Sequence, residues 1–202
     1  MTQSDLFISS EADAYTARNL EHNARYRITD DVVAQCLDEV IPAIKPGCII
    51  DYGCSTGERL EALCGRYRCD GVGCDPSRIA IHVACSRAHP DIRWYIRALP
   101  CEVSQPVDLI VSSYVWHWIA REDLIDSMRA IDYQLVPGGH LVINDFHSVA
   151  DVPYRHREGI TTFKRHYPEM FVATGLYRVV HRVGYAYPGG DEPCDCAVLR
   201  KQ

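Results

Sequence analysis

A glycine-rich turn and a nearby carboxylate are the residues whose types and spacing best suit chemistry on a bound ligand. The turn spans Asp51-Tyr52-Gly53-Cys54-Ser55-Thr56-Gly57 after an apolar pair, and Asp75 lies 22 residues beyond Gly53. Glycine has no Cβ, so a turn built on it can bend sharply and lie against a ligand. A carboxylate at the end of the next strand can accept hydrogen bonds from ribose hydroxyls. This interval suits one βαβ unit and predicts a nucleotide-type ligand.

The turn departs from the dinucleotide-binding pattern GxGxxG. Counted from Gly53, that pattern needs glycines at the positions that Ser55 and Glu58 occupy. A serine side chain leaves less room for a pyrophosphate, and the Glu58 carboxylate would repel it. We therefore do not expect a dinucleotide here.

Alternating strand and helix patterns must position these residues. A helical pattern covers 10–43, with Asp30 as the expected N-cap of its second helix. Strands are then expected at 48–52, 71–74, 92–96, 106–113 and 140–146, and helices at 58–68, 77–87 and 121–135. After an irregular stretch at 147–166, the strand patterns 177–187 and 194–200 predict an antiparallel edge hairpin. The alternation favours an α/β fold with a parallel sheet between helices.

Length and charge narrow the class of protein. A chain of 202 residues suits one domain, so we expect a single domain over 1–202. A net charge of −6 provides no basic face for a nucleic acid, which leaves a small molecule as the expected partner. No apolar run reaches the roughly 20 residues of a membrane span, so we expect a protein that is not in a membrane.

The ten cysteines do not form a pattern of disulfides or metal ligands. Most lie in apolar strand or helix patterns and no signal peptide precedes them, which favours reduced thiols and a cytoplasmic protein. The chain has no CxxC pair, and Cys194-x-Cys196 has no second ligand pair nearby. We therefore expect no metal site.

The form Asp51-x-Gly53-Cys54-x-x-Gly57 resembles motif I of the class I S-adenosylmethionine-dependent methyltransferases, in particular small methyltransferase domains of type 12. Further segments resemble this family over about 46–201. Asp75-Pro76-Ser77 is similar to its ribose-binding strand end, and Ala98-Leu99-Pro100 to its adenine-side loop. The segment 107–119 resembles the strand that faces the reacting methyl group, and 135–143 the turn before the fifth strand. The family usually has glycine in place of Ser55 and an acidic residue in place of Arg97.

The resemblance implies a Rossmann-like, seven-stranded, mostly parallel sheet that binds S-adenosyl-L-methionine. It also implies a helical lid at 1–46 over a cofactor-binding core at 47–202. Arg25 in the lid is our candidate for the cofactor carboxylate, because its guanidinium fork suits that group. The cofactor-binding residues that we expect are Arg25, Tyr26, Asp51, Gly53, Ser55, Gly57, Asp75, Pro76, Ala98, Leu99, Ser112 and Tyr114.

Aromatic residues follow the predicted strand ends, where ligands of open α/β sheets lie. They are Tyr52, Tyr114, Trp116, Trp118 and Phe146. Aromatic faces attract cations, so these rings could surround the sulfonium, or they could simply cover the sheet edge. Of the five, we expect Trp118 to be structural.

Four residues are candidates for catalysis. His117 could act as a general base or orient an acceptor, because the imidazole pKa lies near neutrality. Asn144 and Asp145 close the fifth strand and could bind an amine or a hydroxyl, although Asp145 could equally cap the following turn. Tyr177 is a further candidate for holding an amine.

Three functions remain open from the sequence. The first is methyl transfer from S-adenosylmethionine to a small molecule. The second, which the resemblance admits, is a cyclase in which the cofactor's amine attacks its own γ-carbon, giving azetidine-2-carboxylate and methylthioadenosine. The third is a non-catalytic subunit that binds the cofactor.

Overall fold

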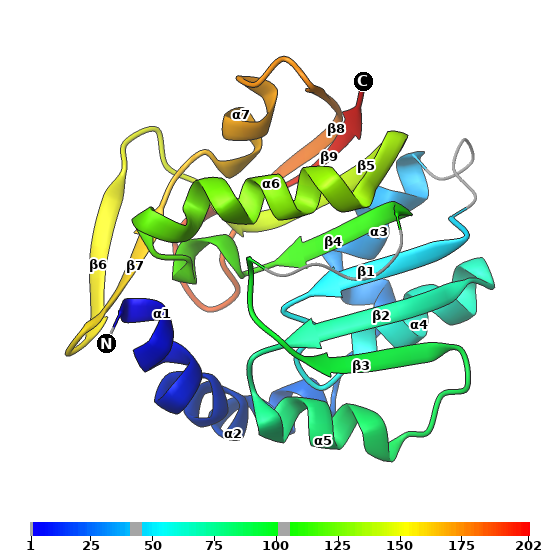
Figure 1. The fold of residues 1–202 in the computed structure, drawn as a ribbon, viewed down its shortest axis with the longest axis horizontal. Coiled ribbons are helices and arrows are strands. Elements are labelled where there is room, and N and C mark those ends of the chain that lie inside the picture. The colour runs from blue at the N-terminus through cyan, green and yellow to red at the C-terminus, as the bar shows by residue number, and fades with distance from the viewer. Residues whose placement is uncertain (1, 41–45, 101–105) are drawn as a thin grey trace.

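A seven-stranded sheet with the strand order β3-β2-β1-β4-β5-β9-β8 lies at the centre of the protein (Figure 1). The computed structural model describes residues 2–40, 46–100 and 106–202. Strand β9 runs antiparallel to both β5 and β8, whereas β1 to β5 pair in parallel. The predicted α/β fold and its C-terminal edge hairpin are therefore confirmed. The strands are β1 (Cys48–Tyr52), β2 (Asp70–Asp75), β3 (Ile92–Ile96), β4 (Val107–Ser113), β5 (Leu135–Phe146), β8 (Tyr177–Ala186) and β9 (Pro193–Lys201).

Helices precede and connect these strands. They are α1 (Gln3–Leu6), α2 (Ala12–Asn23), α3 (Val32–Val40), α4 (Glu58–Tyr67), α5 (Arg78–Ser86), α6 (Leu124–Gln134) and α7 (Tyr167–Val172), with a π-helical turn at Phe7–Glu11. The expected N-cap at Asp30 is wrong by one residue. Asp31 caps α3, since its Oδ1 accepts hydrogen bonds from the backbone N–H groups of Val33 (2.8 Å) and Ala34 (3.1 Å). The expected helix end at residue 43 lies outside the described residues.

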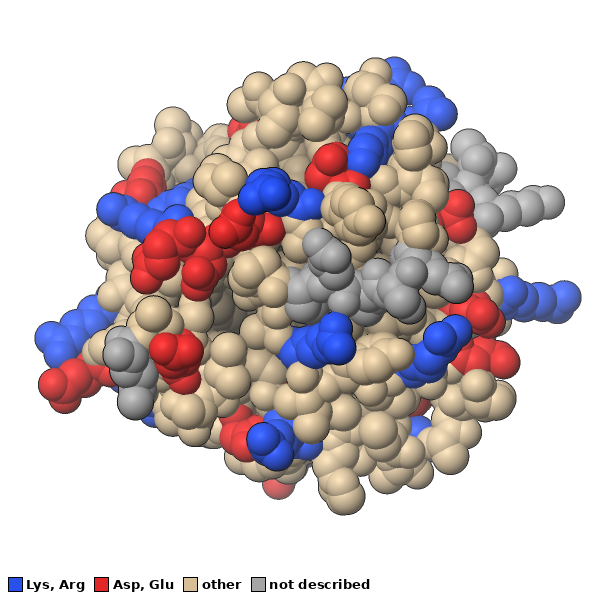
Figure 2. Space-filling view, in the orientation of Figure 1, with Lys and Arg blue, Asp and Glu red and all other residues tan. Residues whose placement is uncertain are grey.

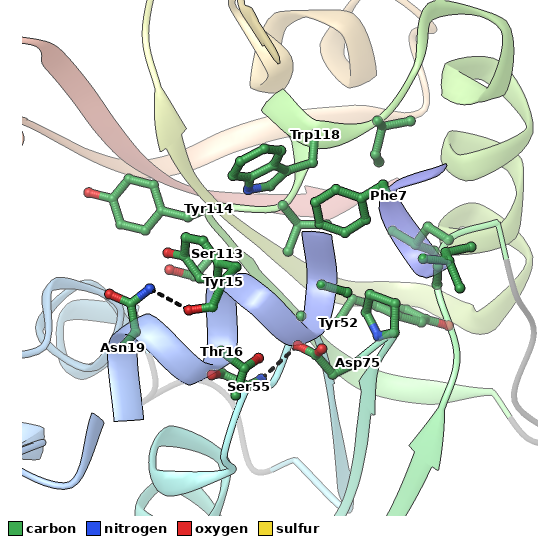
Figure 3. Close-up of a pocket in the computed structure, with 18 of the residues that line it drawn as sticks. Phe7, Tyr15, Thr16, Asn19, Tyr52, Ser55, Asp75, Ser113, Tyr114 and Trp118 are labelled. Carbon is green, nitrogen blue, oxygen red and sulfur yellow. Dashed lines mark hydrogen bonds between the residues drawn. The ribbon is translucent and has the colours of Figure 1, made fainter. Parts of the chain in front are cut away.

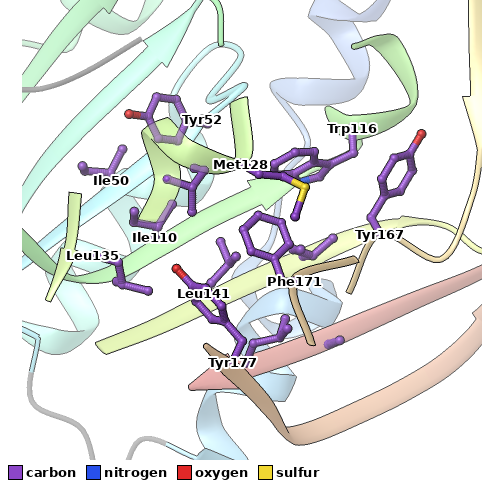
Figure 4. Packing of buried hydrophobic residues seen from close by; sticks show 14 of the residues in the cluster. Ile50, Tyr52, Ile110, Trp116, Met128, Leu135, Leu141, Tyr167, Phe171 and Tyr177 are labelled. Carbon is purple, nitrogen blue, oxygen red and sulfur yellow. The ribbon is translucent and has the colours of Figure 1, made fainter. Parts of the chain in front are cut away.

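Successive residues of the central strands enter two different cores. In β1, Ile49 packs with α3 and α4, whereas Ile50 packs with α6 and α7. The same alternation holds in β9, where Val198 joins the first cluster and Leu199 the second. Both faces of the sheet are thus buried, which explains the continuous apolar runs in the sequence. Figure 4 shows the second cluster, in which Trp116 and Phe171 lie near Met128 and Tyr167.

The sequence suggested an irregular stretch at 147–166, but most of this stretch is regular. It forms a separate two-stranded antiparallel sheet of β6 (Val152–Arg157) and β7 (Ile160–Lys164), which turns at Gly159 with a φ of +76°. Strand β6 is largely exposed, so it lacks the alternation of apolar and polar residues that marks a half-buried strand. It also contains Pro153. In Figure 1 this hairpin lies beside the N-terminal helix α1, which makes it part of the surroundings of the candidate site.

Acidic and basic side chains are interspersed on the face of the molecule shown in Figure 2. Among the described residues, none of the helices combines the length and the apolar character that crossing a membrane requires.

We predict that Phe171→Ala lowers the free energy of unfolding by about 3–5 kcal/mol, because it leaves a cavity in the core. Phe171 is 1% exposed, and its ring centroid lies 5.3 Å from that of Trp116 and 5.2 Å from that of Tyr177. Denaturation by urea measures the loss. Tyr133→Ala is the control, because Tyr133 is 73% exposed on α6 and its loss should cost less than about 0.5 kcal/mol. Equal losses for the two variants would contradict this assignment of the core.

Candidate active site

The glycine turn after β1 packs tightly against the loop that follows β4. Gly53 has a φ of +72°, and a Cβ added there would lie 2.2 Å from Cγ2 of Val115. The backbone N–H groups of Gly53 and Cys54 both donate to the carbonyl oxygen of Cys74, at 2.8 and 3.2 Å. The turn therefore needs glycine at this position for two reasons, its left-handed backbone and the lack of space.

Ser55 takes the left-handed conformation, with a φ of +49°, at the position where the related motif usually has glycine. Its backbone N–H donates to Oδ2 of Asp75 at 2.9 Å (Figure 3), while the N–H of Ser77 donates to Oδ1 at 2.8 Å. Burial raises the pKa of Asp75 to about 6, and these two hydrogen bonds oppose that rise. A carboxylate has about four acceptor positions, so Asp75 keeps capacity for ligand hydroxyls.

A cavity of about 520 Å³ opens between this end of the sheet and the N-terminal helices. That volume lies within the range of small-molecule sites, roughly 300–1,000 Å³. The side of the cavity formed by the sheet includes Tyr52, Asp75 and Ser113, and the opposite side includes Phe7, Tyr15 and Thr16 (Figure 3). The N-terminal helices thus lie over the carboxyl ends of β1, β2 and β4, where ligands of open α/β sheets bind.

The structure brings seven of the expected cofactor-binding residues to this one cavity, namely Gly53, Ser55, Asp75, Pro76, Ala98, Leu99 and Tyr114. Five others are not among the residues that line it: Arg25, Tyr26, Asp51, Gly57 and Ser112. Successive side chains of a strand alternate between its faces, so Ser113 lines the cavity in place of Ser112. Gly57 instead makes room for a core ring, because a Cβ there would lie 2.6 Å from Trp94.

Arg59, rather than Arg25, is the arginine of the glycine-turn region that lines the cavity. The Arg25 side chain is 81% exposed and lies 4.0 Å from the Glu21 carboxylate. Arg59 comes from the first turn of α4, and its Nε donates to Oδ2 of Asp31 at 2.8 Å. The sequence carried a signal for Arg59, since it stands two residues after Gly57, at the start of the helix that the turn begins.

Asp51 and Tyr26 lie in the buried surroundings of Arg59. Asp51 is fully buried, and burial raises the pKa of its carboxyl to about 7, although the Arg59 charge acts in the opposite direction. Neither oxygen of this carboxyl has a hydrogen-bond partner among the described residues. Burial and the nearby Asp31 charge raise the pKa of Tyr26 above its usual value. These groups contribute polarity close to the guanidinium without lining the cavity.

The candidate catalytic residues do not line the cavity either. The Asp145 carboxylate holds the loop after β4, because it accepts hydrogen bonds from the backbone N–H of Trp116 (2.8 Å) and lies 2.7 Å from Nδ1 of His117. His117 is 5% exposed, and its ring packs against Phe146 and Trp118. Both residues therefore occupy positions that fix the wall of the cavity.

Asn144 forms hydrogen bonds to residues of the same wall, whereas Tyr177 lies in the hydrophobic core. Nδ2 of Asn144 donates to Oγ of Ser113 at 2.9 Å, and its Oδ1 accepts from the hydroxyl of Tyr185 at 2.5 Å. That hydroxyl lies 2.7 Å from the hydroxyl of Tyr114, which lines the cavity. Tyr177 belongs to the core at the start of β8, and its hydroxyl donates to Oδ1 of Asp132 at 2.8 Å.

Of the two tryptophans in the loop after β4, one lines the cavity and the other lies in the hydrophobic core. Trp118 lines the cavity, with its ring centroid 5.1 Å from that of Phe7 and 5.9 Å from that of Tyr15 (Figure 3). Trp116, in contrast, is fully buried between α6 and α7. Trp116 is therefore the ring of this pair that enters the core, because the short 3-10 turn at Trp116–Trp118 sends its first ring inward and its last ring toward the N-terminal helices. Whether Trp118 has only a structural role stays a prediction.

The N-terminal segment is attached on both sides. Toward the sheet, Nδ2 of Asn23 donates to Oγ of Ser55 at 2.9 Å. Toward the β6–β7 hairpin, Gln3 exchanges two hydrogen bonds with the backbone of Thr161, at 2.8 and 3.0 Å. Glu11 is 1% exposed and lies 3.1 Å from Nη1 of Arg157. The contribution of Phe7 and Ile8 to the cavity had no signal in the sequence, because it depends on these long-range contacts.

Curated relatives match part of the chain. It is 27% identical over 115 residues to the carboxy-S-adenosyl-L-methionine synthase of Pseudomonas aeruginosa, a match that covers 51% of this chain and 47% of the relative. The corresponding protein of Pseudomonas paraeruginosa is also 27% identical over 115 residues. The chain therefore spans about half the length of the curated relatives that it matches.

Solved structures resemble nearly the whole chain. The N-methyltransferase NodS from Bradyrhizobium japonicum, in complex with S-adenosyl-L-homocysteine, superposes with a TM-score of 0.69 at 22% identity, covering 94% of this chain and 98% of NodS. The 1,6-didemethyltoxoflavin-N1-methyltransferase of Burkholderia thailandensis, with bound 1,6-didemethyltoxoflavin and S-adenosylhomocysteine, gives a TM-score of 0.71 at 14% identity. This match covers 96% of this chain and 90% of that protein.

A family model for the methyltransferase domain matches residues 20–187, which include the glycine turn, Asp75 and the loop after β4. The chain therefore belongs to the methyltransferase domain family, and its fold is that of the class I S-adenosylmethionine-dependent methyltransferases.

Proposed function

We propose that the cavity binds S-adenosyl-L-methionine and that the protein transfers the cofactor's methyl group to a small molecule. The observation that carries this proposal is the gathering of the ribose-type carboxylate, the glycine turn and the adenine-side loop around one cavity of about 520 Å³. The fit is supported by Gly53, which lines the cavity and whose missing Cβ lets the turn pack against Val115, and by the spare acceptor capacity of Asp75.

Each part of the cofactor has a counterpart in the lining. Asp75 would accept the ribose hydroxyls, and Ala98 and Leu99 would cover the adenine. The Arg59 guanidinium would hold the carboxylate, since its fork matches that group. Tyr52, Tyr114 and Trp118 would offer ring faces to the sulfonium, each contributing about 0.5–2 kcal/mol.

When bound, S-adenosylmethionine supplies an electrophilic methyl carbon on a sulfonium. The task of the protein is then to hold the acceptor in line with that carbon, and such positioning can contribute up to roughly 7–11 kcal/mol. Asp145 and Asn144 serve this task indirectly, because they fix the backbone and side chains of the loop that carries Tyr114 and Trp118. The N-terminal helices, held to the glycine turn by Asn23 and to β7 by Gln3, would exclude water from the reaction.

The lid side of the cavity suggests what kind of acceptor it receives. Phe7, Ile8 and Ile119 line this side, together with Trp118 and the loop at Tyr187. None of these side chains carries a charge, so an uncharged and partly apolar small molecule is the acceptor that they favour.

Chemistry on the cofactor itself is a second candidate function. The curated relative is named as a synthase of carboxy-S-adenosyl-L-methionine, a modified form of the cofactor. A cavity of about 520 Å³ that must hold S-adenosylmethionine leaves limited room for an acceptor. Cyclisation of the cofactor to azetidine-2-carboxylate and methylthioadenosine is a different reaction, in which the amine displaces the sulfur from the γ-carbon, but it too uses the cofactor as substrate.

We predict that incubation of the purified protein with S-adenosylmethionine and a small-molecule extract yields S-adenosylhomocysteine together with a methylated product. Mass spectrometry identifies both, and the reaction with cofactor alone is the control. Methylthioadenosine above the spontaneous background, or another product derived from the cofactor in that control, would instead support the second function. Binding of the cofactor without any product in either mixture would contradict both enzymatic proposals.

We predict that affinity for S-adenosylhomocysteine falls as the pH drops below about 6, because Asp75, with its pKa raised to about 6, loses the charge that strengthens its hydrogen bonds. Calorimetric titration should show about tenfold weaker binding at pH 5 than at pH 8. Asp75→Asn should bind more weakly at pH 8 and show a flatter pH profile. Asp70→Asn, at the exposed start of the same strand, is the control and should behave like the unmodified protein.

We predict that Arg59→Lys weakens S-adenosylhomocysteine binding roughly 10- to 100-fold, whereas Arg25→Lys changes it less than twofold. Both substitutions keep the positive charge, so Asp31 retains a cation nearby, and only the guanidinium fork is lost. The same titration at pH 8 measures both affinities. The reverse ranking would restore Arg25 as the carboxylate-binding residue.

A further inference from the structure

A second cavity, of about 540 Å³, lies at the opposite ends of the strands from the proposed cofactor site. Its lining includes Val40, the last residue of α3, and Arg200, which lies two residues before the end of the sequence. The basic residues in its lining are His140, Arg178 and Arg200, and the segment Pro137-Gly138-Gly139 near the start of β5 forms one side. The function described above makes no use of these residues.

Strand register places the three basic residues in one row. His140 of β5 is paired with Arg200 of β9, and Arg200 is paired with Arg178 of β8. Directly opposite residues of antiparallel strands have Cβ atoms about 4.5–5.5 Å apart on the same face, so the two guanidinium groups are cross-strand neighbours. Like charges in this arrangement destabilise a sheet, which makes an unexplained pair of arginines a costly feature.

Within the described part of the chain, neither arginine forms an ion pair. Nε of Arg200 donates to the carbonyl oxygen of Gly138 at 3.3 Å. Asp108 is the one carboxylate among the described lining residues, and its Oδ2 accepts from the backbone N–H of Gly47 at 2.8 Å. Even if this carboxylate offsets one guanidinium, the groove keeps a net positive charge.

His140 adds a buried imidazole with an unpartnered nitrogen to this row. It is 8% exposed, and its Nδ1 has no hydrogen-bond partner among the described residues. Burial, followed by the Arg200 and Arg178 charges, lowers the pKa of its imidazole. A bound anion would counter the repulsion by both arginines and would favour the protonated imidazole, which donates from both nitrogens.

We propose that this groove binds a phosphate-type oxyanion, either inorganic phosphate or the phosphate group of a metabolite, between Arg178, Arg200 and His140. Guanidinium forks match phosphate oxygens in pairs, which favours this ligand over a monatomic anion such as chloride. The segment Pro137-Gly138-Gly139 borders the groove, and Gly138 there has a φ of +81°, a backbone conformation that favours glycine. The site is separate from the methyltransferase cavity and does not depend on what that cavity binds.

Calorimetric titration with sodium phosphate at pH 7, with sodium chloride holding the ionic strength constant, tests the proposal. We expect saturable binding that Arg178→Gln/Arg200→Gln weakens at least tenfold. Arg93→Gln, an exposed arginine on the far edge strand β3, is the matched control and should leave phosphate affinity unchanged. Thermal melting without phosphate should show the double variant close in stability to the unmodified protein, since relief of the like-charge pair offsets loss of the hydrogen bond from Arg200 to Gly138.

The imidazole signals of His140 provide a second readout by nuclear magnetic resonance. Phosphate should raise the pKa of His140 in the unmodified protein and should leave it unchanged in the double variant. Glycerol phosphate replaces inorganic phosphate in a parallel titration, and tighter binding of the ester would identify a metabolite as the ligand. Absence of saturable binding, equal binding by the double variant, or equal effects of phosphate and chloride would each overturn the proposal.

Discussion

The buried carboxylate of Asp75 connects the two loops on which the candidate site depends. Its two oxygens accept hydrogen bonds from the backbone N–H groups of Ser55, in the glycine turn after β1, and Ser77, just before α5. Burial works against the charge of this carboxyl and raises its pKa, so the hydrogen bonds are needed to keep it ionised near neutrality. The same group therefore shapes the turn and offers its remaining acceptor positions to the cavity.

Polar residues behind the cavity act mainly through other residues. Asp145 fixes the backbone of the loop after β4, and Asn144 links Ser113 to the Tyr185 and Tyr114 hydroxyls. Hydrogen-bonded groups of this kind, buried to 1% exposure, give the cavity wall a defined shape. In the proposed methyl transfer, which depends on alignment more than on proton movement, such rigidity is itself a contribution to catalysis.

The two ends of the sheet have contrasting chemistry. At the carboxyl ends of β1, β2 and β4, aromatic rings and one carboxylate suit the cationic, nucleoside-bearing cofactor that we propose. At the other end, a row of two arginines and a histidine suits an anion. Such a division arises easily in a twisted open sheet, because the strands bury their middle residues on both faces and leave only their ends for polar ligands.

The order of strands and helices, the glycine turn and Asp75 could be predicted because they rest on local patterns. Apolar runs mark strands that are buried on both faces, and a left-handed turn has few residue choices. The β6–β7 hairpin was missed because β6 is largely exposed and carries no such alternation. The N-cap was misplaced by one residue because Asp30 and Asp31 are equally suited to capping.

The amino-acid sequence by itself thus determined the fold class, the end of the sheet at which the cavity lies and seven of the residues that line this cavity. Tertiary structure alone decided that Arg59 lines the cavity while Arg25 is exposed, that Trp118 faces the N-terminal helices while Trp116 enters the core, and that His140, Arg200 and Arg178 form one row. The physical reason is that a pattern along the chain records which residues must be buried. It does not record which distant segment buries them, and that partner decides where each side chain points.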